Sequence, residues 1–205
     1  MGEPIVGYGP TMSNAVAATR NVDTPETGTN ETDEIKSVVA GLSQETTREI
    51  LSILQSRLVA TLDLQLTLKH VHWNVVGMNF IAIHEMLDPQ VDAVRVQSDE
   101  IAERIATLGG EPRGTPGAIV DGRSWDDYDI DRAPTVQHLV ALDKVYSGVI
   151  ADHRAAVARF GELDPVSEDL LIGHLRALEL FQWFVRSHLQ VATGDVVHRT
   201  TFTKS

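Results

Sequence analysis

The sequence predicts an all-α protein built as a four-helix bundle with one long crossover connection. Four long segments carry apolar residues at intervals of three and four, which is typical of helices that bury one face. Short turns separate the first segment from the second and the third from the fourth, whereas a connection of about 25 residues separates the middle two. No alternating apolar and polar run indicates a strand, and the sequence contains no internal repeat.

The first half of the bundle is predicted as a helical hairpin. The first helix runs from Ser43, a favourable N-cap residue, to about Trp73. The second helix begins at Asn79, which is expected to act as its cap, and ends at Leu108 before Gly109. The apolar stripe of the first helix consists of Leu51, Leu54, Leu58, Leu62 and Leu66.

The second half begins after a Gly- and Pro-rich crossover, which is expected to carry a short helical turn at residues 124–128. The third helix opens at Pro134. The fourth is predicted from Asp164, an N-cap followed by Pro165 at the first helical position, to about Ala192. Four such helices with one long crossover describe a bundle of the ferritin-like type.

The bundle domain is therefore predicted to occupy residues 43–193, between two tails. Residues 1–42 are poor in large apolar side chains and carry six acidic residues against two basic ones. This composition predicts an extended or disordered acidic tail. Residues 194–205 are expected to form a short C-terminal tail.

Composition excludes several classes of function. The 205-residue chain has a formal net charge of −12, which disfavours general binding to nucleic acid or anionic membranes and favours attraction of cations. It contains no cysteine, so disulfides, thiolate zinc sites and cysteine nucleophiles are excluded. No apolar run approaches the roughly 20 residues that span a bilayer. The N-terminus lacks a basic region followed by an apolar core, and a cytoplasmic protein is therefore expected.

Histidines and carboxylates between residues 69 and 114 are candidate metal ligands, because these side chains bind hard or borderline transition metals. Two pairs are spaced four residues apart on the second helix, so each pair projects from one helix face. Eleven residues separate the pairs, almost a whole number of turns, so both share that face. The pairs are His84 with Asp88 and Asp99 with Glu103, and His72 lies at the end of the first helix.

The length of the helix decides how these ligands are used. At the usual rise per residue, His84 and Asp99 are about 22 Å apart along the axis, too far to share one metal centre. An antiparallel twofold pairing with a second copy of the chain brings the two pairs together and creates two equivalent sites. The spacing thus predicts a dimer with metal between its subunits. The alternative is an ordinary solvated helix face, since a single His-x-x-x-Asp pair is more often a surface pair.

The same stretch resembles a known family. KHVHWNVVGMNFIAIHEMLD, followed by DEIAERIATLGGEPRG, is similar to the characteristic motif of the Dps family, the mini-ferritins that protect DNA in starved bacteria. The resemblance covers the four-helix region and implies hollow dodecamers that oxidise Fe(II), usually with hydrogen peroxide, and store ferric mineral. His72, His84 and Asp88 match the ferroxidase ligands of one subunit, and Asp99 and Glu103 match those of its twofold partner. By the same resemblance Trp73 lies beside this di-iron site.

Three functions remain open from the sequence. The first is a peroxide-dependent ferroxidase with iron storage. The second is a DNA-compacting nucleoid protein, although family members that coat DNA usually do so through a lysine-rich terminus. Here the N-terminal tail is acidic, and Arg199 and Lys204 are the only lysine or arginine residues of the C-terminal tail. The third is a zinc-binding shell without turnover, because zinc accepts the same ligands and can substitute for iron.

Other acidic residues have two interpretations each. Glu85, Glu100 and Asp152 either help to nucleate mineral or form a solvated helix face. Asp164, Glu168 and Asp169 either line an iron-entry pore or act as a cap and first-turn acids that favour the helix dipole. The di-iron centre of ordinary ferritins is disfavoured, because no Glu is followed three residues later by His.

Overall fold

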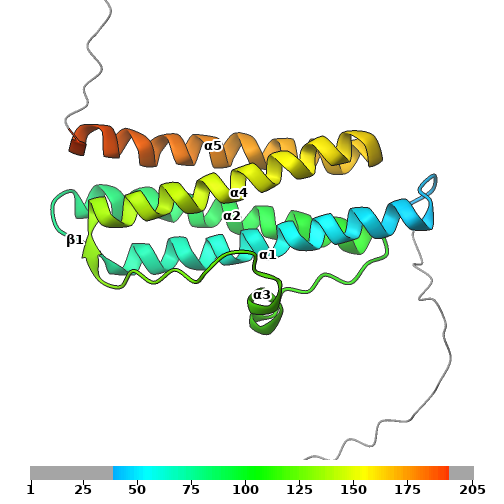
Figure 1. The fold of residues 1–205 in the computed structure, drawn as a ribbon, viewed down its shortest axis with the longest axis horizontal. Coiled ribbons are helices and arrows are strands. Elements are labelled where there is room, and N and C mark those ends of the chain that lie inside the picture. Colours follow the sequence, from blue (N-terminus) through cyan, green and yellow to red (C-terminus); the bar gives the residue numbers. More distant parts are fainter. Residues whose placement is uncertain (1–38, 194–205) are drawn as a thin grey trace, which may run out of the picture. The chain divides into compact units, whose positions relative to one another are not determined.

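A computed structural model describes residues 39–193, and these form the predicted bundle. Four long helices lie side by side, and a short fifth helix packs outside them (Figure 1). The ferritin-like helical fold expected from the sequence is confirmed. The predicted tails lie outside the described residues, except for residues 39–42. The helices are α1 (Gln44–Asn74), α2 (Phe80–Thr107), α3 (Pro116–Gly122), α4 (Thr135–Leu163) and α5 (Pro165–Thr193).

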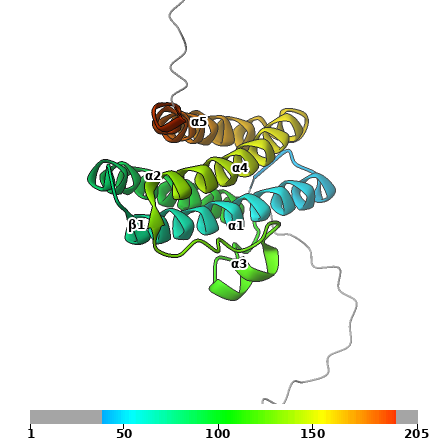
Figure 2. The same ribbon diagram turned by 60° about the vertical axis from the view of Figure 1, so that its left-hand side comes forward.

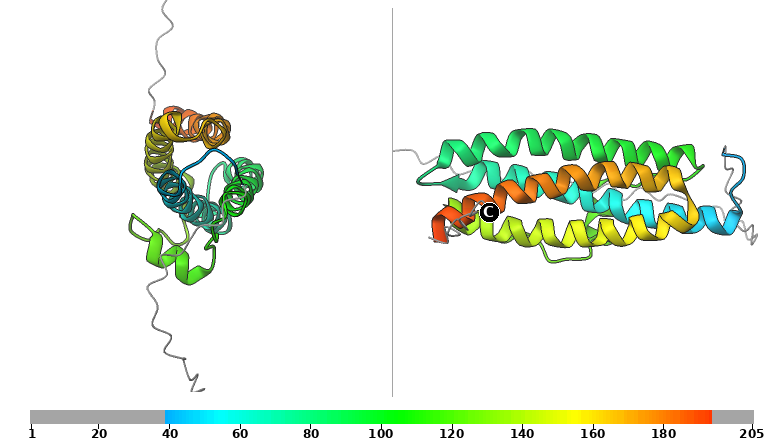
Figure 3. Two further views of the ribbon diagram at one scale, coloured as in Figure 1. Left: turned by 90° about the vertical axis from the view of Figure 1, so that its right-hand side faces the viewer. Right: turned by 90° about the horizontal axis from the view of Figure 1, so that it is seen from above.

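The long helices are arranged as two hairpins, α1 with α2 and α4 with α5. Helix α1 also contacts α4, and α2 contacts α5, so the four helices form a ring when seen end-on (Figure 3). The α1/α4 and α2/α5 interfaces therefore lie on opposite sides of the bundle. The crossover carries the chain back along the bundle, so α2 and α4 run in the same direction (Figures 1 and 2).

The short helix of the crossover lies earlier than predicted. Helix α3 spans Pro116–Gly122, whereas residues 124–128 are not helical, so that prediction was wrong. Proline is favourable at the start of a helix, and buried Ile119 gives α3 an apolar anchor. The later segment instead forms local bonds, because Asp127 accepts hydrogen bonds from the Arg123 guanidinium and from the backbone N–H of Tyr128.

A small parallel pairing of strands, absent from the sequence prediction, fixes the end of the crossover. Strand β1 (Val75–Val76) follows α1 and pairs with β2 (Ala133–Pro134), which precedes α4. The turn from α1 to α2 then passes through Gly77, at φ +96°, and Asn79, at φ +65°. Asn79 occupies the N-cap position of α2 as predicted, but its side chain makes no capping bond, and its left-handed backbone makes it part of the turn.

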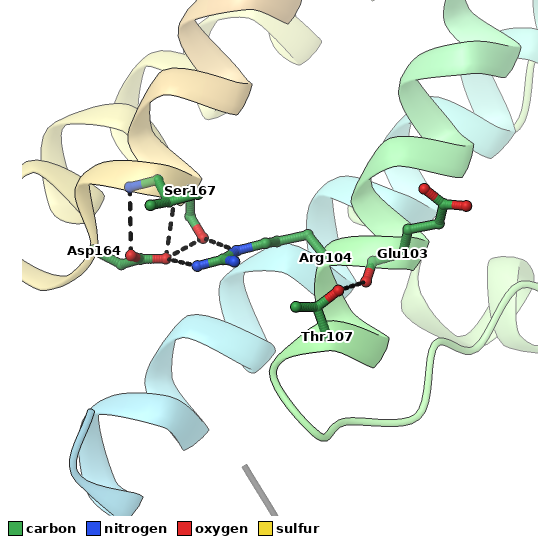
Figure 4. Close-up of polar contacts among 6 residues, drawn as sticks. Glu103, Arg104, Thr107, Asp164 and Ser167 are labelled. Atoms are coloured by element: carbon green, nitrogen blue, oxygen red, sulfur yellow. Dashed lines mark hydrogen bonds and ion pairs between the residues drawn. The ribbon is translucent and has the colours of Figure 1, made fainter. Parts of the chain in front are cut away.

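Two predicted helix caps are present. The hydroxyl of Ser43 accepts a 3.0 Å hydrogen bond from the backbone of Thr46 at the start of α1. At the start of α5, buried Asp164 accepts bonds from the backbone and hydroxyl of Ser167, and from Arg104 of α2 at 2.6 Å (Figure 4). The Asp164 carboxylate is therefore engaged in capping and ion pairing, which supports its interpretation as a cap over a pore-lining role.

The interior consists of two apolar clusters with polar side chains between them. One cluster includes Leu68, Leu87 and Tyr146, and the other includes Leu54 and Phe160. Between them, the long helices contribute several buried polar side chains, among them Thr61 and Ser98, and four others come one from each long helix. We call these four the mid-bundle layer: Arg57 of α1, Gln97 of α2, His153 of α4 and His174 of α5.

The capping ion pair predicts a large effect on stability. We expect Asp164→Asn to lower the free energy of unfolding by about 3–5 kcal/mol, because it leaves the mostly buried Arg104 without its carboxylate. Urea unfolding at matched protein concentrations measures this change. Asp169→Asn is the control, since it removes an exposed acid from the same helical turn. A loss equal to that of the control would contradict the prediction.

The effect of Asp164 on stability should depend on pH. Burial acts to raise the pKa of Asp164, but hydrogen bonds from Ser167 and Arg104 outweigh it and hold that pKa below its usual value. A depressed pKa stabilises the folded state above the pKa of the unfolded chain, and this contribution is lost as the pH falls through the folded value. The difference in unfolding free energy between wild type and Asp164→Asn should therefore shrink in acid. An unchanged difference would be inconsistent with this ion pair.

Candidate functional site

The turn between α1 and α2 brings two of the predicted ligands into contact. His72 is on the last turn of α1 and His84 is near the start of α2, and their rings stack with centroids 3.6 Å apart. The Nδ1 of each histidine donates to the backbone carbonyl of the other at 2.9 Å. Because a carbonyl only accepts, both Nδ1 atoms carry a proton, and Nε2 is the ring atom of each histidine that is left to bind a metal. Such backbone bonds are typical of histidines oriented for metal binding.

Asp88 lies one turn further along α2 and joins this pair. Its Oδ1 is 3.3 Å from Nδ1 of His72 and 2.7 Å from Nζ of Lys69. The hydrogen bond from Lys69 is the main cause that lowers the pKa of Asp88 below its ordinary value. The carboxylate is therefore ionised and held near the two imidazoles. The sequence prediction did not include Lys69, although its position three residues before His72 places it on the same part of α1.

Asp99 and Glu103 do not join this group within one chain. Helix α2 continues through Pro89, so the axial distance from His84 to Asp99 remains about 22 Å. Both acids are exposed, and the Glu103 side chain points away from the Arg104–Asp164 ion pair (Figure 4). Across residues 39–193, no three His, Asp or Glu side chains are arranged to hold one metal ion.

A groove lies beside Asp99 of the Asp99–Glu103 pair. Asp99 lines a depression of about 660 Å³ formed by α1, α2 and the start of the crossover. Exposed Val96 lines it too, and Leu66 of α1 is 59% exposed. Large apolar side chains beside a groove are typical of surfaces that contact another protein. The geometry offers two incomplete ligand sets on one chain, one with imidazoles and one with carboxylates alone.

Comparisons with known proteins identify the family. The ferritin-like domain matches residues 51–193. A DNA protection during starvation protein of Mycolicibacterium smegmatis is 56% identical over 160 residues, which cover 78% of this chain and 87% of that protein. This chain belongs to the Dps family of ferritin-like proteins. The solved structure of DpsA14 from Streptomyces coelicolor superposes with a TM-score of 0.75 at 59% identity, covering 76% of this Dps-family chain and 93% of DpsA14.

Relatives of this Dps-family chain do not all carry the same functional name. The fine tangled pili major subunit of Haemophilus ducreyi is 49% identical over 158 residues, which cover 77% of this chain and 84% of that protein. Membership of the family therefore establishes the fold and the ancestry, whereas activity has to be argued from the site.

The remaining predicted residues differ in their surroundings. Glu100 bonds to His174 at 2.8 Å, and Asp152 contacts Arg57 at 3.4 Å, so both acids have partners within the bundle. Trp73, which follows His72, is 69% exposed. No helix among the described residues is long and apolar enough to cross a membrane. The basic residues of the C-terminal tail, Arg199 and Lys204, lie outside the described residues.

The Lys69–Asp88 contact can be tested directly. We expect Lys69→Met to raise the pKa of Asp88 toward that of an ordinary aspartate, because it removes the hydrogen bond that contributes most to the lowered value. Infrared difference titration of the carboxylate band measures the shift, with Asp88→Asn to identify the band. Lys144→Met, on exposed α4 surface, is the control and should leave the band unchanged.

Proposed function

We propose that the protein is a ferroxidase and iron-storage mini-ferritin whose di-iron sites lie between twofold-related subunits. His72, His84 and Asp88 of one subunit would face Asp99 and Glu103 of its partner. The observation that carries the proposal is the separation of the two ligand sets along continuous α2, since neither set is sufficient alone. An antiparallel pairing joins each set to the complementary set of the second chain and repeats the site by symmetry.

The ligand types fit this reaction. Imidazole nitrogens bind ferrous iron, which has to enter first, and carboxylates are hard donors that favour the ferric state. The Nε2 atoms of His72 and His84, together with the ionised carboxylate of Asp88, provide the ligands for ferrous iron. Glu103 can bridge two irons, so that each gives one electron to a peroxide molecule, which is reduced to water. Peroxide is thus consumed without release of a hydroxyl radical.

Exposed Val96, which lines the Asp99 groove, supports a subunit contact at this surface. The proposal further includes a hollow dodecamer that stores ferric mineral, which follows from the family. Zinc is expected to compete for the same ligands, because it binds His and carboxylate side chains. DNA binding is the weaker alternative: it is favoured by the name of the Mycolicibacterium smegmatis relative and opposed by the net charge of −12.

Co-assembly of two inactive variants tests the site between subunits. Asp88→Ala and Asp99→Ala should each lose the rapid ferric absorbance formed with Fe(II) and peroxide in stopped flow. When the two variants are refolded together, every mixed dimer has one site with both changes and one intact site. Random pairing should therefore restore about one quarter of the wild-type sites.

The controls of this experiment separate the alternatives. Asp92→Ala, on the same helix, is expected to keep wild-type activity, and assembly size is checked for every sample. Sites contained within one chain would give no recovery on mixing. Wild-type rates equal to those of buffer would reject the ferroxidase function itself and favour the zinc-binding or DNA-binding interpretation.

Trp73 is proposed to intercept stray oxidising equivalents, because its exposed indole directly follows His72. Trp73→Phe should leave ferric formation unchanged and increase the yield of spin-trapped radicals and of oxidised protein. Trp183→Phe, which changes an exposed tryptophan on α5, is the matched control. Unchanged radical yield and protein damage in Trp73→Phe would exclude this role.

A further inference from the structure

A large surface cavity lies between the crossover and the first half of α4. Its volume is about 860 Å³, which lies in the range of roughly 300–1,000 Å³ that is typical of small-molecule sites. The crossover lines it with residues 125–130, and α4 lines it from Val136 to Val149. The two buried residues of the lining are Val149 and Thr67 of α1, so the cavity extends from the surface to the core of the bundle.

The sequence of α4 explains why this space stays open. Ala141 and Gly148 both line the cavity and are seven residues apart, almost two full turns, so they lie on the same helix face. A side chain at Gly148 would meet no described atom within 4 Å. Glycine inside a helix costs about 0.5–1 kcal/mol relative to alanine. Packing does not require glycine here, and its effect is to widen the cavity.

The walls of the cavity are largely apolar. Val136 and Val140 of α4 are 44% and 45% exposed, although both are apolar. On the opposite side, the crossover contributes the half-buried side chains of Trp125, Tyr128 and Ile130. Apolar side chains that gather around a cavity and remain in contact with solvent are typical of a surface that binds another molecule. The walls therefore favour a ligand with an apolar body.

The charged residues of the lining are mostly acidic. The crossover contributes Asp126, Asp127 and Asp129, whereas Lys144 is the lone basic residue of the lining. Asp127 is engaged by Arg123 at 2.8 Å. Asp126 and Asp129 are exposed, and neither forms an ion pair with another residue of the described part of the chain. These two carboxylates are therefore available to a positively charged ligand.

The charge of Asp129 lies close to the aromatic wall. Burial raises the pKa of Tyr128, and the negative charge of Asp129 adds to this effect. Trp125 supplies a second ring, and the face of an indole attracts cations as well as apolar groups. The cavity thus combines apolar walls, aromatic rings and unpaired carboxylates.

This combination selects among ligand classes. A hard metal cation is opposed, because apolar walls cannot replace its hydration shell and no three His, Asp or Glu side chains of residues 39–193 are arranged to hold one ion. An anion is opposed by the aspartates. An organic cation with an apolar body satisfies both the walls and the carboxylates.

We propose that the cavity between the crossover and α4 binds an amphipathic organic cation. Its apolar body contacts Trp125 and the valines of α4, and its ammonium group pairs with Asp126 and Asp129. The bound molecule connects the crossover to α4, which are joined at the same place by the 2.9 Å hydrogen bond between Tyr128 and His138. None of the proposed iron ligands lines this cavity, so the proposal is independent of the ferroxidase function.

Isothermal titration calorimetry with three matched probes tests the proposal. The full chain, freed of metal, is titrated with naphthylmethylammonium, with uncharged naphthylmethanol and with the naphthoate anion, which share one ring system. The cation should bind with one molecule per subunit, the alcohol more weakly and the anion most weakly. Added salt should reduce the advantage of the cation, because it screens the exposed carboxylates. Absence of cation binding, or equal binding of cation and anion, would overturn the proposal.

Two variants identify the site. Gly148→Leu places a side chain in the cavity and should weaken binding of both the cation and the alcohol severalfold. Gly173→Leu is the matched control, because Gly173 lies within α5 and a side chain there would meet only the end of the Arg176 side chain, at 3.9 Å. Equal affinities of these two variants for the cation would show that the probe binds elsewhere and would overturn the proposal.

The double variant Asp126→Asn/Asp129→Asn tests the charge alone. Both side chains are exposed, so this variant keeps the test decisive if Gly148→Leu fails to fold. The affinity for the cation should fall severalfold toward that of the alcohol, while the affinity for the alcohol stays unchanged. An unchanged affinity for the cation would contradict the assigned role of the two carboxylates.

Discussion

The continuity of α2 is the constraint on which the organisation of this protein depends. Its buried face packs into both apolar clusters of the bundle, and the helix continues for 28 residues although Pro89 lies inside it. Proline is tolerated here because it lies on the exposed side of the helix. A helix held in this way separates its two ligand pairs permanently. Any reaction that needs both pairs therefore requires a second chain.

The same packing divides the interior of the bundle into two apolar compartments. Ferritin-like bundles can carry metal-binding carboxylates at the centre of the four helices. Here the centre is occupied by Arg57, Gln97, His153 and His174, and the positive charge of the Arg57 guanidinium opposes a cation site there. The metal site proposed above lies instead at the surface of the bundle. Polar groups at this depth are costly unless they are satisfied, and they therefore specify their partners strongly.

Charged side chains stabilise the ends of the helices and orient the site as well. Arg104 follows Glu103 on α2, and its bond to Asp164 fixes the end of α2 against the start of α5 (Figure 4). This contact holds the adjacent Glu103 toward solvent. At the other end of α2, Lys69 of α1 holds Asp88 beside the stacked histidines. Each proposed half-site is thus positioned by an ion pair between helices that are neighbours in space.

The sequence by itself determined the four long helices and the Ser43 and Asp164 caps, and it indicated that the ligand pairs are too far apart for one chain. These features depend on local periodicity and on helix length, which are independent of the tertiary fold. Only the tertiary structure decided that the crossover helix is Pro116–Gly122, that Asn79 is a turn residue, and that Lys69 contacts Asp88. It also decided that four polar residues, far apart in the chain, form one layer. Such contacts arise from how the helices pack, and no spacing within a single helix encodes them.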